Sequence, residues 1–377
     1  MKKRRIGKAV TAIICIGLIC LLAASVPRLL TRDADIPGLT AEDRVLLRIW
    51  AVDSPGGAQA WLKAQLRQFE KQHPGVSTWL RTVSAEELAN PDAILPDVVF
   101  YMPGDLTNPQ DLFLPLTGDM AARESGPLRE ELLRCGRWQG VQYGLPVCWS
   151  AWVLAIDSAL EPGTALTPAP TTLLGRPAAT ASASASPTPG YPLSAAAQAD
   201  CALQSPGGAA LFMLSLLLED IPALPEGFGS LTPTEVYAAF QKRQCATAML
   251  TTGQTTAFSG IVSGGSGFPF RIMTADEVIT DQVFLASVTA DAPREAALLL
   301  SHLASTDAQK ALSAQALHTV RDDLTLYASG MSAEVEKAAR HSLSAINAYI
   351  SAQEVLSAAW QAFTGRLTLS EALLMLL

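Results

Sequence analysis

The sequence predicts an α/β protein with a largely parallel sheet, and three observations indicate this class. The chain has 377 residues, of which 49% are apolar and 16% are charged, which is typical of a folded chain with room for two domains. Apolar, β-branched runs alternate with an amphipathic helical segment near the N-terminus. The order strand–helix–strand–strand favours parallel strands joined by a helix.

The first strand is expected over residues 45–52, VLLRIWAV, because this run is apolar and ends at the turn sequence DSPG. A helix should follow, with Ser54 as its N-cap, Pro55 in its first position and an end at residues 73–75, HPG. Its buried face is expected to hold Ala58, Trp61, Leu62, Leu66 and Phe69.

The rest of the chain contains two more strands and then mostly helices. Strands are expected over residues 76–83 and 97–101. Apolar spacing then predicts helices over 209–218, over 234–244, from Asp291 through Ala304, from Ser305 and from Ser332 onward. Thr368 and Glu371 match a capping box that opens the last helix. Residues 253–271 are rich in Gly and Ser, and the run GIVSGGSG at 260–267 is expected to form a loop.

Residues 161–192 differ in composition from the rest. They contain seven prolines and the run ATASASAS. Such a segment buries too little apolar surface to fix its backbone, so we expect a flexible linker or surface insert.

The N-terminus has the pattern of an export segment. Five basic residues precede an uncharged run from Ala9 to Pro27. This predicts a signal peptide or a membrane anchor within residues 1–32, and either places the rest of the chain outside the cytoplasm, at the cell surface or in the periplasm. Ala23 and Ser25 suit a cleavage site, so cleavage and retention both stay open.

Charge and composition exclude several function classes. The chain has 27 Lys and Arg against 35 Asp and Glu; the first 25 residues hold five of the basic residues and no acid, which leaves 22 against 35, a net −13, in the remainder. So acidic a body predicts no nucleic-acid partner, because phosphate contacts need Lys and Arg. With four His and 6% aromatic residues, dense metal sites are not expected.

Four cysteines follow the export segment, and none forms a CxxC motif. Cys135 and Cys148 flank the sequence WQGVQY, which predicts a hairpin with Gln139 and Gly140 at its turn. A disulfide between the two is one of several possibilities in an oxidising compartment.

Six segments, in order, resemble the extracellular solute-binding proteins of ABC importers, of the sugar-binding family 1 type. They are the LRIWAV strand with the helix ending in FEKQHPGV, LPDVVFYMPGDL with LFLPLTGDM, GRWQGVQYGLPVCWSAWVLAIDSAL, FQKRQCATAML, APREAALLLSHLASTDAQKAL and WQAFTGRLTLSEAL. Together they span most of residues 45–375, apart from the insert.

The resemblance implies a two-lobed periplasmic-binding-protein-like fold with discontinuous lobes joined by a hinge. Lobe one would comprise residues 44–147 and 284–319, and lobe two residues 148–283 and 320–377. It also implies a monomer that captures a small solute, a carbohydrate, for the permease subunits of an ABC importer, with the membrane reached through the N-terminal segment. Catalytic residues, metal ligands and cofactors are not expected.

Six residues near the expected cleft are candidate ligand contacts. Carboxylate, phenol and guanidinium groups hydrogen-bond hydroxyls or anions, and aromatic rings pack on the apolar faces of sugars. The candidates are Asp53, Tyr101, Trp149, Trp152, Phe258 and Arg271. Because Trp149 and Trp152 are three apart in a probable strand, only one of them should face the cleft.

The sequence leaves two other function classes to consider, an enzyme and a binding module without a transport role. The sequence contains no GxSxG, HExxH, SxxK or GxxxxGK[ST] motif, so an extracytoplasmic hydrolase is not favoured. The chain is short between Val83 and Leu95, where the family has a helix. This favours an alternative, a degenerate, membrane-tethered sensor or interaction module without a transport role.

Overall fold

The computed structural model describes residues 44–52, 54–88, 96–116, 127–158, 201–202, 208–217, 233–245, 247–290 and 292–377. The chain divides into two compact units, Met1–Arg44 and Val45–Leu377, and nearly all described residues belong to the second. The predicted export segment, the insert at 161–192 and Asp53 lie outside the described residues. Within the described ranges, no helix is long and apolar enough to cross a membrane.

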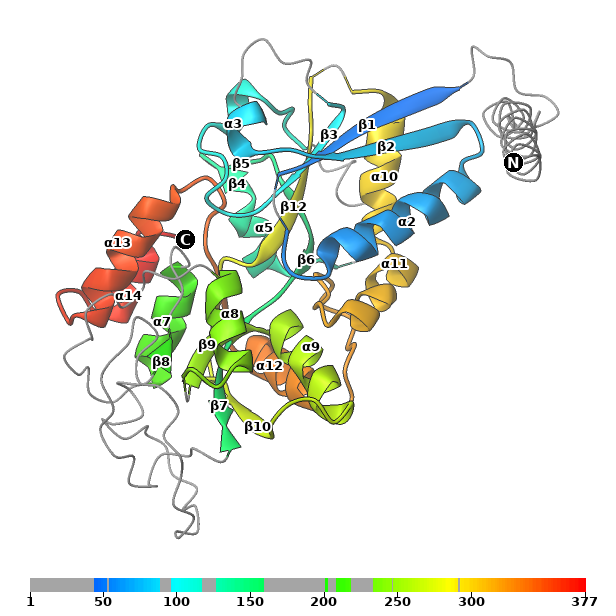
Figure 1. The fold of residues 1–377 in the computed structure, drawn as a ribbon. Coiled ribbons are helices and arrows are strands. Elements are labelled where there is room, and N and C mark those ends of the chain that lie inside the picture. Colours follow the sequence, from blue (N-terminus) through cyan, green and yellow to red (C-terminus); the bar gives the residue numbers. More distant parts are fainter. Residues whose placement is uncertain are drawn as a thin grey trace, which may run out of the picture. The chain divides into compact units, whose positions relative to one another are not determined.

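Five strands form the first sheet in the order β2-β1-β3-β12-β6 (Figure 1). The strands are β1 (Val45–Ala51), β2 (Val76–Thr82), β3 (Val98–Tyr101), β6 (Leu145–Trp149) and β12 (Val283–Val288). β1 is parallel to β2 and β3, whereas β12 is antiparallel to β3 and β6. The helices α2 (Ala58–Gln72), α10 (Arg294–Ala304) and α11 (Thr306–Lys310) share one hydrophobic core with this sheet.

Four strands form the second sheet in the order β10-β7-β9-β8. They are β7 (Trp152–Asp157), β8 (Cys201–Ala202), β9 (Thr247–Thr251) and β10 (Phe270–Met273). One face packs against α7 (Gly208–Leu217), α13 (Ala352–Phe363) and α14 (Leu369–Leu374). The other face packs against α8 (Pro233–Gln241) and α9 (Thr252–Ser263), because alternate residues of β7 point to opposite sides.

A third layer covers the remaining face of the first sheet. Its elements are α5 (Glu130–Cys135), α12 (Met331–His341), β11 (Val278–Thr280) and β13 (Leu343–Ala345). Their apolar side chains form one cluster with Trp50, Val99 and Tyr101 of the first sheet. Smaller elements are α3 (Ala85–Leu88), β4 (Arg137–Trp138), β5 (Val141–Gln142) and the 3₁₀ turns η2 (Pro109–Asp111) and η4 (Ala311–Gln315).

The chain crosses between the two sheets more than once. It leaves the first sheet after Trp149 and enters the second at Trp152, and it returns between Met273 and Val283 by way of β11. A third segment, around His318, pairs with Trp149 through backbone hydrogen bonds in both directions. Each sheet is therefore assembled from separated parts of the sequence. The exact boundaries of the two lobes stay a prediction.

Several sequence predictions are confirmed. The helix α2 buries the five expected side chains. The hairpin β4–β5 forms with Gln139 and Gly140 in the left-handed region, at φ 50° and 82°. The last helix opens with the expected capping box of Thr368 and Glu371.

Other sequence predictions about elements were wrong. The helix α2 begins at Ala58 rather than directly after Ser54. Its N-cap is Gly57, at φ 88°, which has no side chain that could accept a hydrogen bond. Residues 260–263, predicted as part of a Gly-rich loop, belong to α9, which begins at a capping box formed by Thr251 and Gln254. The region after Ser332 is not helical throughout, since it includes β13.

The suggested disulfide between Cys135 and Cys148 is absent. Both cysteines are free thiols, and both are buried. The Cys135 thiol donates to the carbonyl of Ile346 at 3.0 Å. Burial raises the pKa of both thiols far above the usual range, which makes them poor nucleophiles.

Candidate binding cavity between the sheets

A cavity of about 480 Å³ is lined by residues that belong to or adjoin both sheets. Its walls come from the loops after β1 and β3, from the crossovers, and from the helices that cover the second sheet. The described lining residues are Ser54, Gly56, Met102, Pro103, Gly104, Asp105, Trp152, Gly208, Thr234, Thr251, Gln254, Asp281, Gln282, Ile346, Ala352 and Val355. Loops at the carboxyl ends of strands are the usual place for ligands in α/β sheets.

Four helices begin at this cavity. Gly208 is the first residue of α7, Thr234 is the second of α8, Thr251 is the N-cap of α9, and Ala352 is the first of α13. The first turn of a helix carries backbone N–H groups without partners inside the helix. The cavity thus borders four helix starts, and some of their backbone N–H groups are capped by oxygen atoms of the chain.

Trp152 is fixed at the wall of the cavity by a polar anchor. Its indole Nε1–H donates to Oδ1 of Asp281 at 2.8 Å. The same oxygen accepts from Nε2 of Gln282 at 2.9 Å, and Oδ2 accepts from the backbone N–H of Ala209 at 3.3 Å. One carboxylate therefore joins a crossover, β7 and the start of α7. The indole is only 1% exposed, so little of its surface is open to the cavity.

Close backbone approaches narrow the cavity at two places. A Cβ atom added to Gly253 of α9 would lie 3.2 Å from the carbonyl oxygen of Gly56 in the loop after β1. The N–H of Gly104, whose φ is 91°, donates to the carbonyl of Ala348, and a Cβ atom added to it would lie 3.3 Å from Cβ of Ala352. These glycines let elements from the two sheets approach each other closely.

A buried network of hydroxyl groups connects the crossovers beside the cavity. The hydroxyls of Ser150 and Thr252 lie 2.8 Å apart, and the hydroxyl of Thr280 donates to the carbonyl of Ser150 at 2.7 Å. The backbone N–H of Thr252 also donates to the carbonyl of Ala151. Because each buried polar group has a partner, the network fixes the crossovers without leaving a desolvated group unpaired.

The structure places the six predicted contact residues in different surroundings. Trp152 lines the cavity. Trp149 is fully buried against the ring of His318, with a centroid distance of 4.5 Å, and its indole N–H donates to Thr319. Phe258 lies in an aromatic cluster with Phe240 and Phe268, under α8 and α9.

The remaining candidates also lie apart from one another. Tyr101 is fully buried, and its hydroxyl lies 2.7 Å from the hydroxyls of both Ser287 and Tyr349. Arg271 is half-buried in β10, at the edge of the second sheet. Asp53 is outside the described residues, although the next residue, Ser54, lines the cavity. None of the six is thereby established as a ligand contact.

Sequence reasoning missed most of the polar lining. Asp105, Asp281 and Gln282 lie in turns that carry no recognisable motif. Thr251 and Gln254 could have been found from the T-x-x-Q spacing of a capping box, which marks a helix start after β9.

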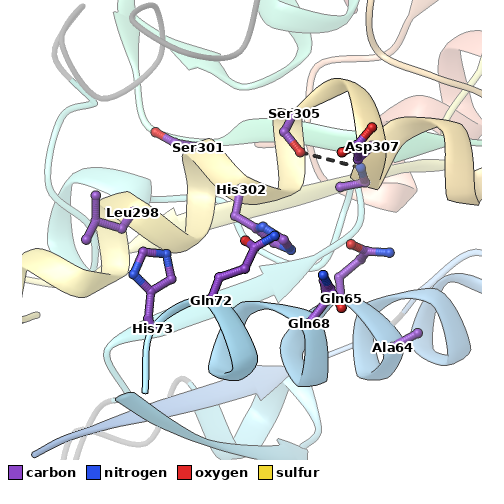
Figure 2. A pocket seen from close by; sticks show the side chains of 11 residues that line it. Ala64, Gln65, Gln68, Gln72, His73, Leu298, Ser301, His302, Ser305 and Asp307 are labelled. Carbon is purple, nitrogen blue, oxygen red and sulfur yellow. Dashed lines mark hydrogen bonds between the residues drawn. The ribbon is translucent and has the colours of Figure 1, made fainter. Parts of the chain in front are cut away.

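A second cavity, of about 540 Å³, lies between α2 and the α10–α11 pair (Figure 2). It is lined by polar groups that include Gln65, Gln68, His73 and His302. Burial lowers the pKa of His302, and His73 lowers it further. All its walls belong to the helices on one face of the first sheet, so a movement between the two sheets would not enclose a ligand there.

Comparison with known proteins gives a result for structure but not for sequence. No protein-family model and no curated protein matches the chain. The structure is similar to that of the GacH receptor of Streptomyces glaucescens, solved unliganded and with acarbose, at 12% identity and a TM-score of 0.58, covering 87% of this chain and 95% of that one.

Two further solved structures agree with this result. The maltose/maltodextrin-binding domain MalE from Bdellovibrio bacteriovorus, bound to maltotriose, is 14% identical with a TM-score of 0.54, covering 87% of this chain and 97% of that one. The sugar-binding protein MalE from Xanthomonas citri is 13% identical with a TM-score of 0.54, covering 88% and 95%. The chain therefore has the two-lobed α/β fold of periplasmic binding proteins, and this fold is shared with sugar-binding proteins of ABC importers.

Proposed function

We propose that the chain captures a small solute, a carbohydrate, in the cavity between its sheets and delivers it to the permease subunits of an ABC importer. The observation that carries this proposal is the cavity itself, which draws its lining from both sheets and from the crossovers. A ligand held there contacts both lobes at once. Its binding therefore favours the closed arrangement and distinguishes a loaded from an empty protein.

The chemistry of the lining suits a polyhydroxylated ligand. Hydroxyl and amide groups of Thr234, Gln254 and Gln282 can donate and accept hydrogen bonds, as sugar hydroxyls do. The apolar side chains of Met102 and Val355 can cover the C–H faces of a sugar ring. A cavity with mixed walls and a volume of a few hundred Å³ is typical of small-molecule sites.

The test is a binding screen on the chain without its N-terminal segment, against mono-, di- and trisaccharides, polyols and peptides. A ligand should raise the melting temperature by RT ln(1 + [L]/Kd) divided by the unfolding entropy, and calorimetry should give one site per chain. If no solute in the screen binds, import is overturned, and the alternative of a membrane-tethered sensor or interaction module is favoured.

We also propose that the body of the protein works outside the cytoplasm and that the N-terminal segment brings it to the membrane. The support is the basic cluster followed by the uncharged run from Ala9 to Pro27. Mass spectrometry of the mature N-terminus distinguishes cleavage after Ser25 from retention. A chain found intact in the cytoplasm would contradict the proposal.

A further inference from the structure

The charges around the cavity have one sign. Among its described lining residues, Asp105 and Asp281 are acidic and none is basic. The Asp105 carboxylate accepts the backbone N–H of Met102 at 2.8 Å, and Asp281 holds three donors, as given above. The described lining therefore carries two carboxylate groups and no cationic side chain. The field inside the cavity opposes a negatively charged ligand.

The helix N-termini that meet at the cavity would by themselves favour an anion, because their free N–H groups and dipoles are positive. Three of them are already capped by oxygen atoms of this chain. Oδ2 of Asp281 accepts from the first turn of α7. Oγ1 of Thr251 accepts from Gln254 of α9 at 3.3 Å.

The third of these helices, α13, is capped twice. Oγ of Ser351 accepts the backbone N–H of Glu354 at 3.3 Å, and the Glu354 carboxylate in turn accepts the N–H and hydroxyl of Ser351. A carboxylate oxygen therefore already accepts a first-turn N–H of α7, and hydroxyl oxygens accept one each in α9 and α13. An incoming phosphate or carboxylate would have to displace these oxygens, and at α7 it would also meet the charge of Asp281.

The rest of the lining divides into a polar and an apolar wall. Thr251 and Gln254 come from the β9–α9 junction, whereas Ala352 and Val355 lie three apart on one face of α13, with Ile346 nearby. The volume, about 480 Å³, is in the lower half of the range for small-molecule sites. Such a site fits one or two sugar rings with hydroxyls on one side and C–H groups on the other.

We infer that the cavity selects short, uncharged sugars, and that Asp105 and Asp281 exclude acidic ones such as uronic acids and sugar phosphates. The inference rests on the proposed function and deepens it. Asp105 is the clearer specificity residue, because Asp281 also anchors Trp152 and α7.

The test compares matched pairs of ligands by calorimetry. Each neutral mono- or disaccharide that binds is measured beside its 6-carboxylate and its phosphate ester. The neutral member of each pair should bind at least tenfold more tightly. A higher salt concentration should reduce this difference in affinity, since salt screens the repulsion between the acidic ligand and the two carboxylates.

The variant Asp105→Asn should reduce the ratio of neutral-sugar affinity to acidic-sugar affinity at least threefold. The amide oxygen can still accept the hydrogen bond from Met102, but the negative charge is removed. Asp276→Asn is the matched control, since Asp276 is exposed in the β10–β11 turn and should leave the ratio unchanged. Asp281→Asn is measured as a second variant, with its melting temperature recorded to detect a loss of folding.

The two proposals fail in different ways. If neutral and acidic sugars bind equally well, or if Asp105→Asn leaves their ratio unchanged, charge exclusion is wrong and solute capture stands. If acidic sugars bind and neutral ones do not, the sign of the selection is reversed. If no sugar of either kind binds, the proposed function fails, and the specificity argument fails with it.

Discussion

Tyr101 shows how one step along a strand decides the surroundings of a side chain. Side chains in β3 alternate between the two faces of the first sheet. Tyr101 therefore points into the layer with α12, where it meets Ser287 and Tyr349, while Met102 at the strand's end lines the cavity. Burial raises the pKa of the Tyr101 phenol far above its usual range, so this group stays protonated.

Tyr101→Phe should therefore lower the free energy of unfolding by about 1–2 kcal/mol, because it leaves buried hydroxyls with one partner fewer. Ligand affinity should not change. Urea unfolding measures the first quantity and calorimetry the second. A loss of affinity with unchanged stability would instead support the direct contact that the sequence suggested.

His318 is a fully buried imidazole at the crossover between the sheets. It stacks on Trp149 and meets the ring of Tyr327 edge-on, and neither ring nitrogen has a hydrogen-bond partner among the described residues. Burial, with a smaller contribution from the positive charge of Arg129, lowers the pKa of His318 to about 3. The folded protein thus holds a neutral imidazole over the whole physiological pH range.

This predicts an acid-sensitive stability. The unfolded chain binds a proton at the ordinary histidine pKa of about 6.5, whereas the folded chain does not until pH about 3. The contribution is therefore complete above pH 6.5 and is lost as the pH falls toward 3, by about 2 kcal/mol between pH 7 and pH 5. His318→Phe should remove this part of the pH dependence in urea unfolding. An unchanged slope would mean that the imidazole is protonated when folded.

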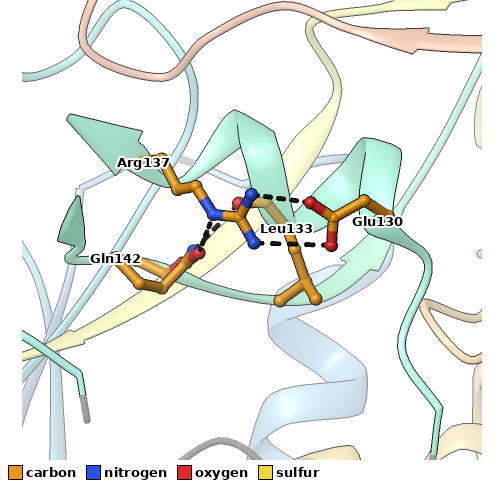
Figure 3. A network of polar contacts seen from close by, with 5 residues as sticks. Glu130, Leu133, Arg137 and Gln142 are labelled. Atoms are coloured by element: carbon orange, nitrogen blue, oxygen red, sulfur yellow. Dashed lines mark hydrogen bonds and ion pairs between the residues drawn. The ribbon is translucent and has the colours of Figure 1, made fainter. Parts of the chain in front are cut away.

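At the scale of elements, the hairpin β4–β5 is joined to α5 by a small polar network (Figure 3). Arg137 pairs with Glu130 at 2.6 Å and donates through Nε to Oε1 of Gln142 at 3.1 Å. Nε2 of Gln142 donates to the carbonyls of Leu133 and Gly144, at 2.9 and 2.6 Å. The Gln142 amide thus donates hydrogen bonds to a carbonyl of α5 and to a carbonyl of the loop that leads into β6.

The two sides of this network should contribute unequally. Gln142→Leu should cost about 1–3 kcal/mol of unfolding free energy, because it removes one donor from each of two partly buried carbonyls, of which that of Leu133 keeps the N–H of Gly136. Glu130→Gln should cost less than about 0.5 kcal/mol, since both partners of that ion pair are exposed to water. Equal losses in thermal or urea unfolding would contradict this division.

Helix α9 shows why an element can escape a sequence pattern. Its sequence, TGQTTAFSGIVS, has few apolar residues and two glycines, so it reads as a loop. The helix forms because its N-terminus is capped by Thr251 and because Thr252, Thr255 and Phe258 are buried against β9 and its neighbours. Tertiary packing outweighs weak helix propensity here.

On the scale of the whole molecule, the proposed binding would depend on how closely elements of the two sheets approach each other. Gly253 in α9 lies against the backbone of Gly56, and Gly260 in the same helix has nothing within 4 Å of where its Cβ would be. Gly253 and Gly260 both lie in α9, but only Gly253 lies close to the backbone of the other lobe.

Gly253→Leu should therefore weaken ligand binding at least tenfold, because the new side chain holds the lobes apart. Gly260→Leu should leave affinity unchanged. Both substitutions should keep or slightly raise the melting temperature, since Leu has a higher helix propensity than Gly. Small-angle scattering should report a more open particle for Gly253→Leu alone. Equal affinities for both variants would show that this contact plays no part in closure.

The sequence by itself determined the α/β class, the strands β1, β2 and β3, the amphipathic face of α2 and the family resemblance, because each of these depends on local spacing of apolar residues and turns. Only the tertiary structure decided which side chains meet at the cavity. Asp105, Thr251, Asp281 and Ala352 are far apart along the chain, and they become neighbours because the chain crosses between the sheets repeatedly. Burial, which depends on every surrounding element, decided that Trp149 and Phe258 pack in hydrophobic clusters while Trp152 reaches the cavity.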